Sequence, residues 1–190
     1  PILIVQQAAA QGITPTRNFG FAAATGNVLG RIDADSIVAP DWVARVSLEL
    51  RDPGVAAVSG PTTYYDLPFR LSTRVSDDLA RRALRAIGRR HPFLIGCNMA
   101  IRADAWRAIE AKTCLDVDDQ MHEDIDIAVH LGEAGLAVGY SSSMRADVSA
   151  RRLATSPSAF RFYTGRFART YASHGIRSTW RLRAPEVLLR

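Results

Sequence analysis

The sequence predicts an α/β fold in which a mainly parallel sheet is flanked by helices. Short apolar runs of strand length alternate with segments whose apolar residues recur every three or four positions, which is the spacing of an amphipathic helix. Such alternation is typical of strands that are joined by helical crossovers. The chain of 190 residues has no internal repeat or low-complexity linker, which favours one continuous fold.

Individual elements follow from the apolar spacing and from residues that start or stop helices. In chain order we expect a strand over 2–5, a helix over 14–26, a strand over 27–32, a helix over 40–54, a strand over 55–65, a helix over 72–90, a strand over 92–102, a helix over 103–111, a helix over 122–136 and a strand over 137–142. Thr14 is the expected N-cap of its helix, Pro15 its first helical residue and Gly26 its stop. Gly135 is expected to end the helix over 122–136.

Two of these helices have apolar faces that predict which residues are buried. The faces consist of Trp42, Val43, Val46 and Leu50 in the first helix, and of Val75, Leu79, Leu84 and Ile87 in the second. The second helix, over 72–90, is also rich in arginine. We therefore expect both helices to pack on the core along one side only.

The C-terminal part of the chain differs from the rest in charge. Residues 149–190 contain nine arginines and one acid, Glu186, in a chain whose net charge is +5. We interpret residues 1–148 as the main α/β domain and 149–190 as a basic helical extension. Such an extension can follow anionic lipid headgroups or an anionic acceptor, although a solvated basic face is the commoner case.

Cysteine content and the chain start bear on the cellular location. Cys97 and Cys114 have neither the spacing of a metal-binding or redox CxxC motif nor the density of a disulfide scaffold, so free thiols are expected. No signal-peptide pattern and no run of eighteen apolar residues is present, and we expect a cytoplasmic protein that can associate with the inner face of a membrane. Because the chain opens on Pro1 and an apolar run, we expect that the natural protein has a preceding part.

The stretch "GRIDADSIVAPDW" places two carboxylates at the end of a buried strand. Asp33 and Asp35 are separated by one alanine, and burying either without a partner would cost several kcal/mol. In open α/β sheets, ligands bind outside the carboxyl ends of strands. Hard oxygen ligands of this kind suit Mg²⁺ or Mn²⁺, with a diphosphate completing the site. A solvated turn without a ligand remains the alternative.

A second acidic cluster, "DVDDQMHEDIDIAVH", precedes and opens the helix over 122–136. It is not a zinc-protease HExxH motif, because Asp126 stands where the second histidine is required. We interpret Asp116 to Asp119 as acids that complement a helix dipole. Glu123 and Asp124 differ, because a carboxylate at the start of a buried helix could serve as a general base.

Three segments together resemble the family 2 glycosyltransferases, which have a GT-A fold. These are "QGITPTRNFGFAAATGNVLGRIDADS", "GCNMAIR" and "HEDIDIAVHLGEAGL", in this order over residues 2 to about 140. The DxD motif of the family matches Asp33-Ala34-Asp35, and its ED motif matches Glu123-Asp124. The first strand, first helix and uridine-contacting strand of the family have no counterpart, so the chain resembles the C-terminal two-thirds of such an enzyme.

The resemblance implies an inverting, metal-dependent enzyme that transfers a sugar from a nucleotide-sugar donor to an acceptor hydroxyl, in cell-envelope glycan or glycolipid synthesis. It implies that Asp35 coordinates Mn or Mg and that Asp33 contacts the metal or the ribose. Asp124 would be the base, supported by Glu123. The "RN" pair of the family matches two further residues that would line the donor site, Arg17 and Asn18.

Other residues carry weaker hypotheses. Trp106 is a candidate for stacking on an acceptor sugar, although a tryptophan on an amphipathic helix is more often part of the core. Asn98 is a candidate for hydrogen bonding to the acceptor, or for capping the next helix. The isolated histidines His91, His122 and His174 could ligate a metal, although a lone histidine is more often structural.

Two other classes of function are compatible with parts of the sequence. A nucleotidyltransferase of similar architecture also uses acidic metal ligands, but would normally show a Gly-rich basic phosphate loop. A non-catalytic basic module could bind membrane or nucleic acid through its arginines, but gives no reason for the two acidic pairs. We expect a nucleotide sugar and a sugar or lipid-linked acceptor as partners, and do not expect nucleic acid.

Overall fold

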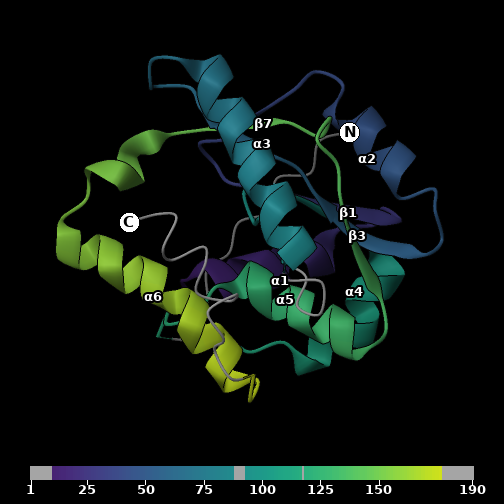
Figure 1. The fold of residues 1–190 in the computed structure, drawn as a ribbon. Helices are drawn as coiled ribbons and strands as arrows, with labels where there is room; N and C mark the ends of the chain where they lie inside the picture. The colour runs from purple at the N-terminus through teal and green to yellow at the C-terminus, as the bar shows by residue number, and fades with distance from the viewer. Residues whose placement is uncertain (1–9, 88–92, 117, 177–190) are drawn as a thin grey trace.

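A computed structural model describes residues 10–87, 93–116 and 118–176 (Figure 1). Its helices are α1 (Ile13–Ala23), α2 (Trp42–Glu49), α3 (Arg70–Ile87), α4 (Ala103–Ile109), α5 (Glu123–Glu133) and α6 (Pro157–Ser173), with short 3-10 turns η1 (Glu110–Lys112) and η2 (Ala150–Ala154). Its strands are β1 (Val28–Ile32), β2 (Ile37–Val38), β3 (Val55–Ser59), β4 (Thr62–Tyr64), β5 (Asn98–Arg102), β6 (Ala137–Tyr140) and β7 (Ala146–Val148). The strand expected over 2–5 lies outside the described residues.

The described strands form two sheets. The larger has the order β1-β5-β3-β6, in which β3 and β6 are parallel while β5 runs antiparallel to both of its neighbours. The sheet is therefore mixed: β1, β3 and β6 point in one direction, and β5 is reversed, so that both of its pairings are antiparallel. The smaller sheet, β2-β7-β4, joins β2 and β7 antiparallel and β4 and β7 parallel.

Helices cover both faces of the larger sheet. Figure 1 shows α1, α4 and α5 on one side of β1 and β3, and α2 on the other. Side chains alternate along the strands to match: Ala57 and Ile101 belong to the core beneath α1, α4 and α5, whereas Val58 and Ala100 belong to the core beneath α2. This period of two is the expected geometry of a strand that is buried on both faces.

Helix α6 packs on α5 rather than extending into solvent. Tyr171 forms a small core with Ile125 and Val129 of α5, and Phe167 packs against it. The basic extension expected from Ser149 is therefore joined to the rest of the fold over the residues that the structure describes. No helix in these described residues is long and apolar enough to cross a membrane.

The start of α1 differs from the expectation. Gly12, with φ of 125°, is the N-cap residue and no side chain caps the helix, whereas Thr14 is buried inside the first turn. The helix ends at Ala23, before Gly26. A glycine fits the N-cap because its positive φ carries no steric penalty there.

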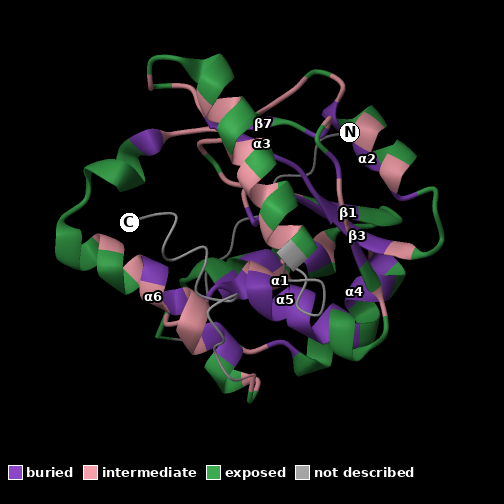
Figure 2. Ribbon diagram, viewed as in Figure 1, coloured by how far each residue is buried: buried purple, intermediate pink, exposed green. Residues whose placement is uncertain are grey.

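Apolar residues on α2 and α3 are more exposed than expected. Val43 is 70% exposed, and Val75 and Leu79 are 50% and 57% exposed, so their predicted burial is wrong. The reason is that α3 packs mainly against the short strand β4, and only its flank meets the protein. Figure 2 shows the outward side of α3 as exposed, in contrast to α5, which is largely buried.

The strand expected over 55–65 is divided into β3 and β4 at Gly60. A Cβ atom at this position would lie 1.7 Å from the carbonyl oxygen of Met144, so no other residue fits without a backbone shift. The chain changes sheets here, and Gly60 allows the segment before β7 to approach. The helix over 122–136 forms as expected, from Glu123 to Glu133, and Gly135 follows with φ of 71°.

Candidate active site

The two carboxylates of the DxD segment lie at the open end of β1. The strand ends at Ile32, and a turn follows in which the amide of Ser36 donates to the carbonyl of Asp33 at 2.9 Å. The Asp33 side chain is 43% exposed and that of Asp35 is 24% exposed. Both carboxylates are therefore accessible at the carboxyl end of a sheet strand, where ligands bind in this fold class.

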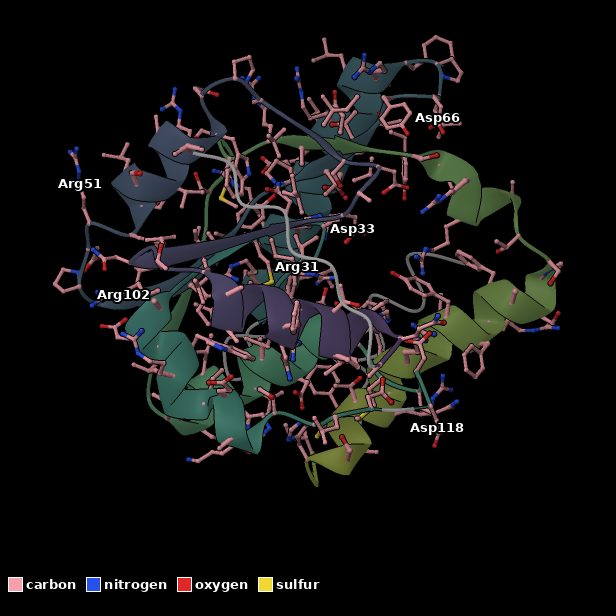
Figure 3. The ribbon with its side chains drawn as sticks, turned by 180° about the vertical axis from the view of Figure 1, so that it is seen from behind. Arg31, Asp33, Arg51, Asp66, Arg102 and Asp118 are labelled. Atoms are coloured by element: carbon pink, nitrogen blue, oxygen red, sulfur yellow. The ribbon has the colours of Figure 1, made fainter. Side chains whose placement is uncertain are left out.

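Arg31 connects this pair to the second acidic pair at the start of α5. Its Nη1 atom lies 2.5 Å from Oε1 of Glu123, and its Nη2 atom lies 3.4 Å from Oδ1 of Asp33. Figure 3 shows the guanidinium of Arg31 pointing towards Asp33 near the middle of the molecule. Residues 92 positions apart are thereby placed in one site, and sequence reasoning gave Arg31 no role.

Burial and opposite charge both act on this ion pair. Burial would lower the pKa of Arg31, but the carboxylates of Glu123 and Asp124 outweigh it and raise that pKa. The pKa of Glu123 is raised, first by burial and then by the charge of Asp124 beside it. Arg31 is thus held as a cation among carboxylates, the arrangement that makes a buried charge tolerable.

Gly96 contacts both Arg31 and Asp124. Its amide donates to Oδ2 of Asp124 at 2.7 Å. A Cβ atom at position 96 would lie 1.8 Å from Nη1 of Arg31, so the guanidinium occupies the space that a side chain would fill. The glycine of the "GCNMAIR" segment is therefore explained by close packing at the site.

Asp124 is half-buried and keeps free acceptor capacity. In addition to the bond from Gly96, Oδ1 of Asp124 accepts from the amide of Ile125 at 2.9 Å. A carboxylate offers about four lone-pair sites, so two amide donors leave room for a further hydrogen. The helix N-terminus, where Asp124 lies, favours a negative charge. Asp124 can therefore accept a proton from a hydroxyl group that reaches the site.

Arg17 and Asn18 lie on α1 beside the same cluster. The Nη1 atom of Arg17 donates to the backbone carbonyl of Glu123 at 3.2 Å, and its Nε and Nη2 atoms donate to Oδ1 of Asn18. Arg17 is buried, and this burial lowers its pKa, with partial compensation from Glu123. These contacts hold α1 against the start of α5, while half-buried Asn18 remains the more accessible of the two.

An arginine-rich pocket adjoins the DxD segment. Arg151 of η2 lies 3.0 Å from Oδ2 of Asp35 and also lines a cavity of about 380 Å³ between η2 and α6. Arg152 and Arg166 line the same cavity, and the guanidinium of Arg152 stacks 4.1 Å from the centroid of the Tyr163 ring. Positive charge is thus gathered directly beside the carboxylates.

Comparison with known proteins identifies the family. The model of the family "Glycosyl transferase family 2" matches residues 1–109, which is more than half of the chain. The chain belongs to this family. No curated protein sequence gives a significant match.

Solved structures with the same fold agree with this family 2 assignment. A mannosyltransferase from Pyrobaculum calidifontis, PcManGT, in complex with GDP-Man and Mn²⁺, is 19% identical, with a TM-score of 0.66 over 97% of this chain and 51% of its own. Glucosyl-3-phosphoglycerate synthase from Mycobacterium tuberculosis, in complex with phosphoglyceric acid, is 17% identical, with a TM-score of 0.56 over 91% of this chain and 59% of its own. The chain has the GT-A glycosyltransferase fold and spans about half the length of these two proteins.

Two residues that were expected to bind the acceptor have structural roles in this family 2 chain. Asn98 is fully buried, accepts from Nε1 of Trp42 at 2.8 Å, and donates to the carbonyls of Pro61 and Met144. Its amide has no hydrogen left for a substrate, and it does not cap α4. Trp106 is 2% exposed and packs in the core against Phe21, so it cannot stack on a sugar. Both residues face inwards, which agrees with the core alternative for Trp106 and gives no support to an acceptor role for either residue.

The isolated histidines that the structure describes have different surroundings. His122 is buried between the rings of Tyr163 and Phe167, and burial lowers its pKa to about 4, which makes it a neutral packing residue. His91 lies outside the described residues. His174 lies at the C-cap of α6, close to Asp126.

The residues of the DxD segment fit a divalent cation. Asp33 and Asp35 supply hard oxygen donors, and their facing partners are the positively charged ends of Arg31 and Arg151. Each carboxylate thus pairs with a different arginine and keeps a part that is open to solvent. Two carboxylates make an incomplete cation site, which phosphate oxygens and water would complete.

Proposed function

We propose that this chain forms the greater part of the active site of an inverting, metal-dependent glycosyltransferase. The enzyme would transfer a sugar from a nucleotide-sugar donor to an acceptor hydroxyl. The proposal rests on one observation: Arg31 contacts both Asp33 and Glu123, which lie in the segments of the proposed cation ligands and of the proposed base. Family membership supports the same reaction class and gives no support to the nucleotidyltransferase alternative.

Asp35 and Asp33 would hold Mn²⁺ or Mg²⁺ together with the donor diphosphate. The cation would offset the negative charge that develops on the leaving nucleoside diphosphate. A neighbour of the same fold was solved with GDP-Man and Mn²⁺, which supports a divalent cation here. Asn18 and Arg17 would border the donor, with Asn18 as the more exposed contact.

Asp124 would act as the general base. The acceptor oxygen forms a bond to the anomeric carbon, its proton passes to a carboxylate oxygen of Asp124, and the bond between the anomeric carbon and the diphosphate oxygen breaks. Attack from the face opposite the leaving group inverts the anomeric configuration. Glu123, paired with Arg31, would act as a positioning residue that keeps the start of α5 beside β1.

The acceptor would carry an anionic group. Arg151, Arg152 and Arg166 line a pocket beside Asp35, and arginine is well suited to phosphate. A lipid-linked phosphate or diphosphate would satisfy this chemistry and would place the enzyme at the inner face of a membrane, in cell-envelope glycan or glycolipid synthesis. The basic extension supports such a peripheral association.

Donor turnover tests this function. The natural protein in full length is incubated with a panel of nucleotide sugars, with Mn²⁺, with Mg²⁺ or with EDTA, and release of the nucleoside diphosphate is measured. We expect release from one donor, dependent on the cation and absent in Asp35→Ala. Undiminished release in EDTA would overturn the metal assignment, and no release from any donor would overturn the glycosyltransferase proposal.

A further inference from the structure

Four potential metal ligands from three segments meet behind the active site. They are the thiol of Cys114, the carboxylate of Asp126 and the imidazoles of His130 and His174, and their ligand atoms all lie within 4.8 Å of one another. Cys114 follows η1, Asp126 and His130 lie four residues apart on α5, and His174 ends α6. Residues at i and i+4 share one face of a helix, which explains how α5 contributes two of them.

Two distances within the cluster are close to the spacing of zinc ligands. Oδ1 of Asp126 lies 2.9 Å from Nε2 of His174 and 3.5 Å from Nε2 of His130. Zinc bonds of about 2.0–2.3 Å place tetrahedral ligand atoms about 3.3–3.8 Å apart. Small side-chain rotations would therefore bring these atoms to the spacing that a zinc ion needs.

His130 gives an independent indication of a missing ligand. Its ring is 8% exposed, and its Nε2 atom is buried without a hydrogen-bond partner among the residues that the structure describes. Its other nitrogen, Nδ1, lies 2.8 Å from Oε2 of Glu133. A hydrogen on Nδ1 would satisfy Glu133 and leave a lone pair on Nε2 directed at the carboxylate of Asp126. Two acceptors facing each other in a buried site call for a cation between them.

The surrounding contacts match those of metal-binding histidines and carboxylates. Such histidines almost always donate their second N–H to a carboxylate or carbonyl, as His130 can to Glu133. Oδ2 of Asp126 accepts from the amide of Cys114 at 3.1 Å, which leaves Oδ1 as the ligand atom. Asp126 is 1% exposed, and the side chain of His174 is 6% exposed. Asp126, His130 and His174 are therefore largely shielded from water, whereas Cys114 is half-buried.

We propose that Cys114, Asp126, His130 and His174 bind one Zn²⁺ ion. Thiolate, imidazole and carboxylate are all zinc ligands, and the two negative charges of this set neutralise the ion. Four protein ligands close the coordination sphere, so the ion is structural. It ties the loop after η1 and the end of α6 to α5, the helix whose first turn carries Asp124. This site is distinct from the oxygen-only pair Asp33 and Asp35, and does not depend on the proposed function.

Metal analysis of the full chain tests the proposal. The protein is purified without a histidine tag, and bound zinc is measured by mass spectrometry and by titration of apo-protein with Zn²⁺. We expect one zinc per chain. We also expect that Co²⁺ substitution produces the visible bands of tetrahedral cobalt and a thiolate-to-cobalt charge-transfer band in the near ultraviolet.

Variants locate the ion. Cys114→Ser should remove the charge-transfer band and most of the zinc, whereas the matched control Cys97→Ser should retain both. Glu133→Gln, at a half-exposed side chain that is not itself a ligand, should weaken zinc binding about ten- to a hundredfold without unfolding the chain. No zinc in the purified protein together with no binding by the apo-protein, or equal zinc in Cys114→Ser and the native protein, would overturn the proposal.

Discussion

Nη1 of Arg31 lies 2.5 Å from Oε1 of Glu123, with both side chains largely buried. This single contact joins the end of β1 to the start of α5 and thereby brings the acidic segments that contain Asp33 and Glu123 together. It also sets Asp124 beside Gly96, whose amide holds that carboxylate. The predictions below follow from this arrangement.

Removing Arg31 should destabilise the fold as well as the site. Arg31→Met leaves Glu123 buried without its cation, which typically costs about 3–5 kcal/mol. The double variant Arg31→Met/Glu123→Gln removes both charges and should recover most of the stability. Urea unfolding of the four proteins in this cycle measures the coupling. If the double variant loses as much stability as the two single variants together, the pair is not coupled.

Asp35→Ala should abolish metal-dependent binding of the nucleoside diphosphate while leaving the fold intact, because Asp35 lies in the turn after β1 and its half-buried carboxylate pairs with the exposed Arg151. Calorimetric titration of nucleoside diphosphate in the presence of Mn²⁺ measures this. Asp118→Asn, a carboxylate far from Asp33 in Figure 3, is the matched control and should bind as the native protein does. Unchanged affinity in Asp35→Ala would contradict its role as a ligand.

Asp124→Asn should lower turnover about 10²- to 10⁴-fold with donor affinity close to that of the native enzyme, because a missing general base slows only the chemical step. The asparagine keeps the shape of the side chain, and its single oxygen can still accept from the amide of Gly96, although not from that of Ile125 as well. Glu123→Gln should have a smaller effect on turnover. The reverse order of the two variants in a steady-state assay would make Glu123 the base.

Asn98→Ala should reduce stability without changing the Michaelis constant for the acceptor. The substitution leaves the indole N–H of Trp42 and the carbonyls of Pro61 and Met144 unpaired in the core. Each unsatisfied buried group costs about 1–3 kcal/mol, so a loss of about 3 kcal/mol or more is expected. Thermal unfolding measures the loss. A raised Michaelis constant at full stability would restore the acceptor role.

Neutralising arginines near the basic pocket should weaken binding to anionic vesicles. The variant Arg152→Ala/Arg161→Ala should lose about fivefold in affinity per arginine at low salt, because each basic residue near such a surface contributes about 1 kcal/mol. Arg51→Ala, at the far end of the molecule in Figure 3, is the control. Co-sedimentation with vesicles at low and high salt measures this binding. Binding that does not depend on lipid charge or on salt would contradict the prediction.

Much of the fold was predictable from local patterns. Apolar alternation identified the strands that became β1, β3 and β6, and the helical spacing with Gly135 behind it identified α5 almost to its ends. Periodicity works for these elements because it reports which side of a strand or helix avoids water. The position of Asp33 after a strand, and of Asp124 at a helix start, followed from the same reasoning. The predicted burial of that strand is wrong, because β1 lies at the edge of the described sheet and only Leu29 is buried in it.

Periodicity gives no information on what covers an apolar face, or on how far it is covered. The exposure of Val75 and Leu79 follows from the narrow contact between α3 and β4, which depends on where the smaller sheet lies. Trp106 and Asn98 are buried for the opposite reason: neighbouring elements of the fold cover them almost completely. Sequence alone shows a polar or aromatic residue at such positions, but only the packed neighbours decide whether a substrate can reach it.

The sequence by itself determined the chemistry of this protein: two acidic pairs at element ends, an α/β scaffold to present them, and an arginine-rich C-terminal part. Tertiary structure alone decided which of those groups meet. Arg31 with Glu123, and Cys114 with His174, are separated by long stretches of chain, and their contact depends on the reversal of β5 and on the docking of α6 on α5. Local propensity acts over a few residues, whereas a site is assembled by the burial of distant faces against one another.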